Sequence, residues 1–394
     1  MFKMHKRDIV SLGQTVIRQA LYWLMLTVSL IAANVSAAED QWQGVERIIA
    51  VGDIHGDYDH YIEVLTHAGL INRRGNWDAG ETHFVQLGDI PDRGPDTDRV
   101  IRHMQQLEAQ AQRAGGRVHA LVGNHEMMNV AGDLRYVHPG EYEALRSRRA
   151  RSLRDSYYQR VVAYLLSQED PPVIDEAFRQ QWEQEYPLGY VEHRNYWSSQ
   201  GEFGKWVLEH NTIIKINNIL FIHGGISPEY LDMGIREINE RVRSELGDLT
   251  LAEPRITELD SGPLWYRGLA LNDAIEELPH VEQILEVYNV DHIVVGHTPG
   301  YGTIVPRFDG KVLVIDSGIS AYYGGHLASL LVENDQLTNI QQGEAIAIPK
   351  DNDNLIAYYE SVLELEPESI NLKNLVNRLK NPSLVSEPVV EPNI

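Results

Sequence analysis

Short apolar runs rich in Ile, Val and Leu recur along the chain, and each ends at a glycine or a polar side chain. Runs of four or five such residues next to glycine suit strands that are buried on both faces. We therefore expect buried strands at residues 47–51, 83–87, 118–122, 219–222 and 292–295.

Segments with helical spacing lie between these runs. Apolar residues in 58–68 recur at three- and four-residue intervals, and residues 97–113 are polar with one apolar side. Residues 281–289 form a third such segment directly before the last buried run. This alternation of strand and helix predicts a layered α/β core.

The apolar pattern continues after residue 300 without the intervening helices. Residues 304–305 and 312–315 are joined through Asp309-Gly310, a dipeptide that favours a tight turn, so they predict a hairpin. A further strand is expected at 327–332. The catalytic domain is expected to span 45–335.

Two segments depart from the alternation. Residues 133–210 are rich in Arg, Glu, Gln, Tyr and Trp and have few strand-like runs, which indicates a mainly helical insertion. We expect this insertion to be cap-like and to sit over the site. Residues 343–394 predict an amphipathic helix over 354–365 and a Pro-rich, acidic tail over 380–394 that is loosely attached.

The first 37 residues have the pattern of an export signal. A basic start is followed by an apolar stretch over 20–33 that is short for a membrane span, and Val35-Ser36-Ala37 offers a cleavage site of small residues. We expect residues 1–37 to be a signal peptide and the protein to be periplasmic. An uncleaved N-terminal membrane anchor is the alternative; after cleavage, no stable membrane association is expected.

Composition and charge exclude several classes of function. The chain has no cysteine, which excludes disulfides, thiolate metal ligands and a cysteine nucleophile. Its formal net charge of −23 argues against a nucleic-acid partner, which would need a broad basic surface. An anionic substrate must therefore be held locally, by metal ions and a few arginines.

Polar motifs follow the predicted strands. They are Gly-Asp-Ile-His-Gly at 52–56, Gly-Asp-Ile-Pro-Asp-Arg-Gly at 88–94, Gly-Asn-His-Glu at 123–126, His-Gly-Gly at 223–225 and Gly-His at 296–297. Loops that follow strands in this way collect at the carboxyl edge of a sheet, where α/β folds place their sites. The motifs together predict a binuclear metal centre for phosphate-ester hydrolysis.

Each motif suggests ligands. Asp53 and His55 can reach one metal from a single loop, and Asp89 can bridge to a second. The candidates for that second metal are Asn124, His223 and His297. Oxygen and imidazole donors without a soft ligand suit Mn, Fe or Zn.

Three further residues in these motifs suggest the chemistry. Arg93 has a planar guanidinium group that can donate paired hydrogen bonds to phosphate oxygens. His125 follows a candidate ligand and would face the leaving group as the proton donor, with Asp92 available to orient it.

Structural explanations compete with these assignments. Asp, Asn and His at loop tips often only cap helices or turns, which explains one motif easily but not five together. Glu126 is expected to support its loop, and His119 and His292 to be structural histidines. The arginine-rich stretch 146–154 is expected to be a solvated helix face. Tyr322-Tyr323 and Trp197 fit packing as readily as a pocket, and we do not assign them to the site.

The first three motifs with His223 and His297 resemble the phosphoprotein-phosphatase branch of the calcineurin-like metallophosphoesterases. The resemblance runs from about 47 to 332 outside the insertion. It implies a β-sandwich flanked by helices and hydrolysis by direct attack of a metal-bridging hydroxide, without a phosphoenzyme. It also implies the roles given above, with Asn124 near the substrate phosphate as well as a metal.

Two finer features specify the branch. Many other metallophosphoesterases carry Gly-His-x-His, whereas the run here is Gly296-His297-Thr298-Pro299. Trp-Tyr-Arg-Gly at 265–268 and the glycine-rich 316–325 look like the Shewanella-like phosphatases, which implies that Arg267 is a second phosphate clamp.

The resemblance implies a phosphatase for phosphoserine, phosphothreonine or phosphotyrosine of proteins, or for small phosphoesters. The first alternative is a nucleotide hydrolase of the diadenosine tetraphosphatase type, since those enzymes use very similar motifs. A catalytically silent phospho-binding protein is the second alternative. Silent relatives usually lose a ligand, the acid or the arginine, and all are present here.

Overall fold

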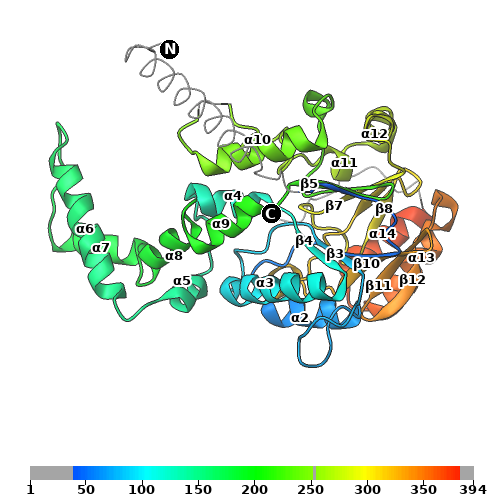
Figure 1. Ribbon diagram of the computed structural model, residues 1–394, viewed down its shortest axis with the longest axis horizontal. Helices are drawn as coiled ribbons and strands as arrows, with labels where there is room; N and C mark the ends of the chain where they lie inside the picture. The colour runs from blue at the N-terminus through cyan, green and yellow to red at the C-terminus, as the bar shows by residue number, and fades with distance from the viewer. Residues whose placement is uncertain (1–38, 252–253, 382–394) are drawn as a thin grey trace, which may run out of the picture. The chain divides into compact units, whose positions relative to one another are not determined.

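The computed structural model describes residues 39–251 and 254–381 (Figure 1). The predicted signal peptide and nearly all of the predicted C-terminal tail lie outside these residues. The elements described below belong to one unit that begins at Asp40. None of the described helices is both long enough and apolar enough to cross a membrane.

The first of two six-stranded sheets carries the first three motifs. Its strands β2, β3 and β4 are parallel neighbours, and β10 pairs antiparallel with β2. In order across the sheet the strands are β12 (Glu344–Ala347), β11 (Gln336–Gln341), β10 (Ala328–Glu333), β2 (Arg47–Val51), β3 (His83–Gln86) and β4 (Arg117–Ala120).

The second sheet carries the two later histidine motifs. Strands β6, β7 and β9 are parallel neighbours, and β8 pairs antiparallel with β9 as the predicted hairpin requires. In order the strands are β1 (Gln41–Trp42), β5 (Ile213–Ile216), β6 (Ile219–Ile222), β7 (His292–Val295), β9 (Val312–Val314) and β8 (Val305–Arg307).

Helices connect and cover the strands. The two that link the parallel strands of the first sheet are α2 (Tyr58–His67) and α3 (Thr97–Ala114). The others outside the insertion are α4 (Asn124–Ala131), α10 (Ile235–Gly247), α11 (Gly268–Leu271), α12 (Ala274–Tyr288), α13 (Leu355–Leu365) and α14 (Ile370–Lys380).

Five helices lie within residues 133–210. They are α5 (Pro139–Leu145), α6 (Ala150–Leu166), α7 (Glu176–Glu185), α8 (Tyr190–Trp197) and α9 (Glu202–Glu209). Helix α5 contacts α3 and α8, and α8 also contacts α4, so the insertion packs against the helices nearest the third motif (Figure 1).

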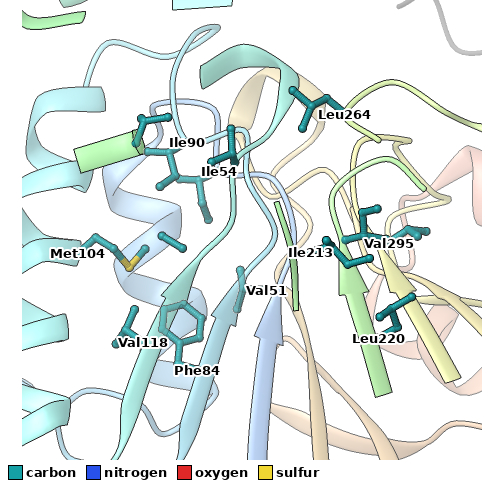
Figure 2. Close-up of a cluster of buried hydrophobic side chains, with 14 of the residues drawn as sticks. Val51, Ile54, Phe84, Ile90, Met104, Val118, Ile213, Leu220, Leu264 and Val295 are labelled. Atoms are coloured by element: carbon teal, nitrogen blue, oxygen red, sulfur yellow. The ribbon is translucent and has the colours of Figure 1, made fainter. Parts of the chain in front are cut away.

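The core follows the two-residue period of the strands. Ile48 of β2 and Phe221 of β6 belong to a buried cluster that includes inward-facing residues of both sheets. The alternate residues of the same sheets face the other way. Figure 2 shows three of them, Val51, Phe84 and Leu220, in the second buried cluster, which extends toward the helices. The result is the predicted α/β sandwich of two mixed sheets with helices outside.

Some boundaries differ from expectation. Helix α12 begins at Ala274, seven residues before the predicted 281–289, because Asp273 caps it by accepting hydrogen bonds from the N–H groups of Ile275 and Glu276. Pro279 lies inside this helix. Because proline usually marks a helix boundary, the sequence pattern predicts a helix that begins only after it. Strand β5 was not predicted; its one polar residue, Lys215, is buried and donates to the carbonyls of Tyr288 and Asn289.

Candidate metal centre

The loops that carry the five motifs meet at one end of the sandwich. The first three follow β2, β3 and β4, which are parallel neighbours, and the other two follow the parallel neighbours β6 and β7. The first two loops are also joined by backbone: the N–H groups of Ile54 and His55 both donate to the carbonyl of Asp89 at 3.0 Å. The site is therefore assembled by both sheets.

Several site residues have backbone dihedrals that are uncommon for residues other than glycine. Positive φ angles occur at His55 (50°), Asp89 (56°), Asp92 (72°), Arg93 (65°) and His297 (64°). Such conformations cost free energy and are kept where surrounding contacts enforce them, typically at functional sites.

Gly88 shows how closely the loops approach. Its φ is +97°, and a Cβ atom there would lie 2.6 Å from the Gly123 nitrogen and 2.9 Å from Nδ1 of His223. Only glycine fits this position without displacing the backbone of the third motif.

The first group of candidate ligands surrounds His55. Its Nδ1 contacts the carbonyl of Pro91 at 3.2 Å, so Nε2 is the nitrogen that faces the site. That Nε2 lies 3.9 Å from one oxygen each of Asp53 and Asp89. Donor atoms of His55 and Asp89 also lie within 4.8 Å of one of His125, which the sequence analysis assigns as the proton donor and not as a ligand.

The second group shares Asp89 with the first. Donor atoms of Asp89, His223 and His297 also lie within 4.8 Å of one another, and Nε2 of His223 is 3.0 Å from Oδ1 of Asn124. Nδ1 of His223 contacts the carbonyl of Leu87 at 2.7 Å, which again leaves Nε2 toward the site. Asp89 is thus the one residue common to both groups, as a bridging ligand must be.

The donor set fits metal ions. Nε2 of His297 is buried and has no hydrogen-bond partner among the described residues, although such nitrogens normally find one. Carboxylate oxygens and imidazole nitrogens are ligands that Mn, Fe and Zn accept. All six predicted ligands are buried and lie together; their assignment to individual metals stays a prediction.

Burial and neighbouring charges shift the pKa values of the site residues. Burial, with the nearby carboxylates of Asp316 and Asp89, raises the pKa of Asp53 well above its usual range. Burial lowers the pKa of His55 to about 3 and that of His297 well below its usual value, so both are neutral imidazoles that can act as ligands. For Asp89, His223 and His125 outweigh burial and hold its pKa well below normal.

Glu126 holds the loops of the second and third motifs together through hydrogen bonds to their backbone. Its carboxylate accepts hydrogen bonds from the N–H groups of Asp89 (2.9 Å), Ile90 (2.8 Å) and Gly123 (2.8 Å). The last of these is part of the N-terminal cap of α4. Glu126 therefore ties the second motif to the third, as the sequence analysis expected.

His125 is paired as a proton donor would be. Its ring Nδ1 lies 2.5 Å from Oδ2 of Asp92, and its backbone N–H donates to Oδ1 of Asp89 at 2.9 Å. Asn129, one turn later on α4, donates from Nδ2 to the other Asp92 oxygen at 3.0 Å. Burial by itself would lower the pKa of His125, but Asp89 and Asp92 outweigh it and raise that pKa.

The two predicted arginines also lie at this end. The guanidinium of Arg93 stacks 3.9 Å from the ring centroid of Tyr136 and donates to the hydroxyl of Tyr322 at 3.1 Å. Arg267 donates to the carbonyl of His297 at 2.8 Å and to Oγ1 of Thr298 at 3.1 Å. Both arginines are thus fixed beside the candidate ligands.

The structure adds residues that the sequence analysis did not assign. Tyr136 and Tyr322 flank Arg93, Tyr323 lies 5.1 Å from His55 between ring centroids, and buried Asp316 raises the pKa of Asp53. Asn129 was not assigned either, although it had a usable signal, since it lies four residues after His125 and so on the same face of a helix. Asp316 lies in the 316–325 stretch that the sequence analysis noted, but no role was given to it.

Several structural expectations are confirmed. Nε2 of His119 contacts His83 at 3.0 Å, and Nδ1 of His292 contacts the carbonyl of Gly310 at 2.9 Å. Trp197 is fully buried. The arginine-rich stretch is largely exposed as expected, but it is only in part a helix face, because Arg146, Arg148 and Arg149 lie in the connection between α5 and α6.

Comparison with known proteins is consistent with this geometry. The family described as calcineurin-like phosphoesterase matches residues 46–301. An uncharacterised protein of Schizosaccharomyces pombe is 33% identical over 306 residues, which cover 74% of this chain and 79% of that protein. Shewanella-like protein phosphatase 2 of Arabidopsis thaliana is 27% identical over 296 residues, 72% of this chain and 73% of that protein.

A solved structure supports the same fold. The crystal structure of the cold-active protein-tyrosine phosphatase of a psychrophilic Shewanella species is 32% identical to this chain and aligns with a TM-score of 0.60. The alignment covers 78% of this chain and 82% of that one.

Proposed function

The chain belongs to the calcineurin-like phosphoesterases, and from that premise we propose that it is a binuclear metal-dependent phosphatase for phosphoserine, phosphothreonine and phosphotyrosine residues of proteins. The observation that carries the proposal is that the six candidate ligands lie buried together and include Asp89, which lies near both His55 and His223, with the His125–Asp92 pair and Arg93 beside them.

The metal ions would be held by six side chains: Asp53, His55, Asp89, Asn124, His223 and His297. When bound, two ions of Mn, Fe or Zn neutralise phosphoryl oxygens and activate the attacking water. Asp89 would serve both positions, and the hydrogen bonds that Nδ1 of His55 and Nδ1 of His223 donate to backbone carbonyls leave Nε2 as the nitrogen that faces the site.

The remaining site residues bind the phosphoryl group and move a proton. Arg93 and Arg267 present guanidinium groups to phosphoryl oxygens, together with the amide of Asn124. His125, held in its protonated form by Asp92, donates its proton to the leaving oxygen of the serine, threonine or tyrosine product.

Two findings support a phosphoprotein substrate. The Arabidopsis relative is named a protein phosphatase and the Shewanella structure a protein-tyrosine phosphatase. In this chain Tyr136 and Tyr322 flank Arg93, and Tyr322 is 58% exposed, so an arriving side chain would meet aromatic surface next to the phosphate clamp. Aromatic surface of this kind suits a phosphotyrosyl ring.

The test is phosphate release from matched phosphotyrosyl and phosphoseryl peptides. The protein without residues 1–37 is chelated and then reloaded with Mn or with Fe and Zn, and Asp89→Asn serves as the control. We expect metal-dependent turnover that the control loses. Turnover of a dinucleoside polyphosphate in place of both peptides would favour the nucleotide-hydrolase alternative, and failure to bind metal would refute the proposal.

We also propose 45–335 as the catalytic domain and 343–394 as a C-terminal segment, which packs on that domain through β12, α13 and α14. We propose as well that the protein is exported to the periplasm by cleavage after residue 37. The support is the basic start, the short apolar stretch and the cleavage site in the sequence. N-terminal sequencing of the protein from a fractionated host should begin at Ala38; an intact N-terminus in the membrane fraction would instead indicate an anchor.

A further inference from the structure

We propose that Glu141, on helix α5 of the 133–210 insertion, is a positioning residue for the Asp92–His125 pair. The insertion would then hold the loop that carries Asp92 and Arg93 in the conformation needed for catalysis, in addition to any role as a cap. This inference rests on the proposed phosphatase function, in which His125 protonates the leaving group.

The loop that carries Asp92 and Arg93 has two consecutive residues in the left-handed region, with φ of 72° and 65°. The backbone N–H of each one is bound by the insertion. Asp92 donates to Oε1 of Glu141 at 3.0 Å, and Arg93 donates to the carbonyl of Tyr136 at 3.1 Å. A strained pair of this kind persists only where its surroundings enforce it, and these two hydrogen bonds come from one segment.

The position of the Asp92 backbone determines the orientation of His125. Both carboxylate oxygens of Asp92 are already committed, one to Nδ1 of His125 at 2.5 Å and the other to Nδ2 of Asn129 at 3.0 Å. If the backbone of Asp92 rotates out of the left-handed region, the carboxylate moves with it. The imidazole then loses the partner that aims it at the leaving group.

The carboxyl group of Glu141 has two backbone partners: the N–H of Asp92 in the catalytic loop and the N–H of His138, the N-cap residue of its own helix α5. Glu141 is 2% exposed, and burial together with Asp92 raises its pKa well above the usual value. The nearest imidazole, His193 of α8, lies 3.7 Å from Oε2, and burial, with the charge of Arg194, lowers its pKa to about 3, so it supplies no charge. An acid buried without a cation costs stability. The bond from His138 only caps α5, whereas the bond from Asp92 reaches outside the insertion to the catalytic loop, and it is this second bond that carries the inference.

The insertion also contains a matched carboxyl group that does not touch the catalytic loop. Glu192 of α8 is 7% exposed, and its Oε1 accepts from the N–H of Ser147 at 3.1 Å and from the Ser147 hydroxyl at 2.6 Å. Its replacement removes a buried carboxyl group from the same segment, so it controls for general loosening of the insertion.

The test compares Glu141→Met, Glu141→Gln and Glu192→Met in the metal-loaded protein. Methionine keeps the length of the side chain and removes the acceptor, whereas glutamine keeps an acceptor oxygen for the Asp92 N–H. The substrates are a phosphoseryl peptide, whose alkoxide leaves poorly, and 4-nitrophenyl phosphate, whose leaving group needs little protonation. Metal content per chain is measured for each variant.

For Glu141→Met we expect kcat on the phosphoseryl peptide to fall about 10- to 100-fold, with a much smaller loss on 4-nitrophenyl phosphate and unchanged metal content. Glu141→Gln should restore most of the activity, and Glu192→Met should not change the ratio between the two substrates.

Equal losses on both substrates, no loss at all, failure of glutamine to restore activity, or a methionine variant that does not fold would each overturn the positioning role in favour of a structural one or none. Absence of phosphomonoesterase activity in the unmutated protein would instead refute the proposed function, so the two failures are distinguishable.

Discussion

At the scale of single residues, the site depends on how burial is offset by neighbours. His55, His125 and His297 are all buried, yet of the three only His125 has its pKa raised, because Asp89 and Asp92 outweigh the effect of burial there. In the proposed function, the same residue type would therefore serve as a neutral ligand at two positions and as a charged acid at the third. Local charge, and not residue type, assigns the role.

This contrast predicts the effect of Asp92→Asn. Removing the carboxylate lowers the pKa of His125, and since the acid must be protonated to act, the fall in activity at alkaline pH moves to lower pH. We also expect kcat on a phosphoseryl peptide to drop about 100-fold or more. The measurement is the pH dependence of kcat for the metal-loaded protein.

A charge-matched control is available nearby. Asp96 makes a surface pair with Arg99 at 3.0 Å, and Asp96→Asn changes the net charge equally. This variant should keep the pH profile of the parent. An alkaline limb that stays in place for Asp92→Asn would contradict the assignment of His125 as the acid.

At the scale of elements, the C-terminal helices form part of the core of the sandwich. Tyr358 and Val362 of α13 and Leu372 of α14 belong to the same buried cluster as the inward-facing residues of the two sheets. The hydroxyl of Tyr358 donates to the carbonyl of Ile304 at 2.8 Å and accepts from Nδ2 of Asn339 at 3.0 Å. Helix α13 is thus attached to both sheets by packing and by a buried polar group.

Tyr358→Phe tests this attachment. The substitution keeps the ring but leaves the Ile304 carbonyl without its tyrosine donor, which should lower the free energy of unfolding by about 1–3 kcal/mol. Because Tyr358 lies away from the candidate ligands, kcat should stay within the error of the parent. Urea unfolding followed by circular dichroism gives the stability. A loss of metal binding in this variant would show that α13 also acts on the site.

At the scale of the whole molecule, the candidate ligands connect the two sheets. Asp53, His55 and Asp89 follow strands of one sheet, whereas His223 and His297 follow strands of the other. Without ions, the carboxylates of Asp53, Asp89 and Asp316 repel one another in a buried space. Bound cations would remove this repulsion and join the sheets.

Metal removal should therefore destabilise the whole fold. Ions present at about 100 times their dissociation constant contribute about 2.7 kcal/mol to the native state. We expect the unfolding temperature to fall on chelation and to recover when Mn or Zn is restored. The Asp89→Asn variant should show little of this response, since it lacks the shared ligand. An equal response in that variant would place the stabilising metal elsewhere.

The sequence alone determined the layered α/β class and which motif residues lie together. Buried strands of a layered fold are continuous apolar runs, and the residues that follow them must lie at a sheet edge, so motif order predicts that Asp53, Asp89, Asn124 and His297 converge. Helices such as α3 were predictable because one apolar face repeats every three or four residues. These features are local, or follow from a rule that every parallel sheet obeys.

The tertiary structure alone decided which distant residues complete the site. Glu141 lies 49 residues after Asp92 and reaches it because α5 packs against α3 and α8. Tyr322 lies 229 residues after Arg93, and its hydroxyl accepts a hydrogen bond from that arginine. No periodicity encodes such contacts. They depend on how whole elements pack, and the free energy of that packing is spread over many residues, so no single motif reports it.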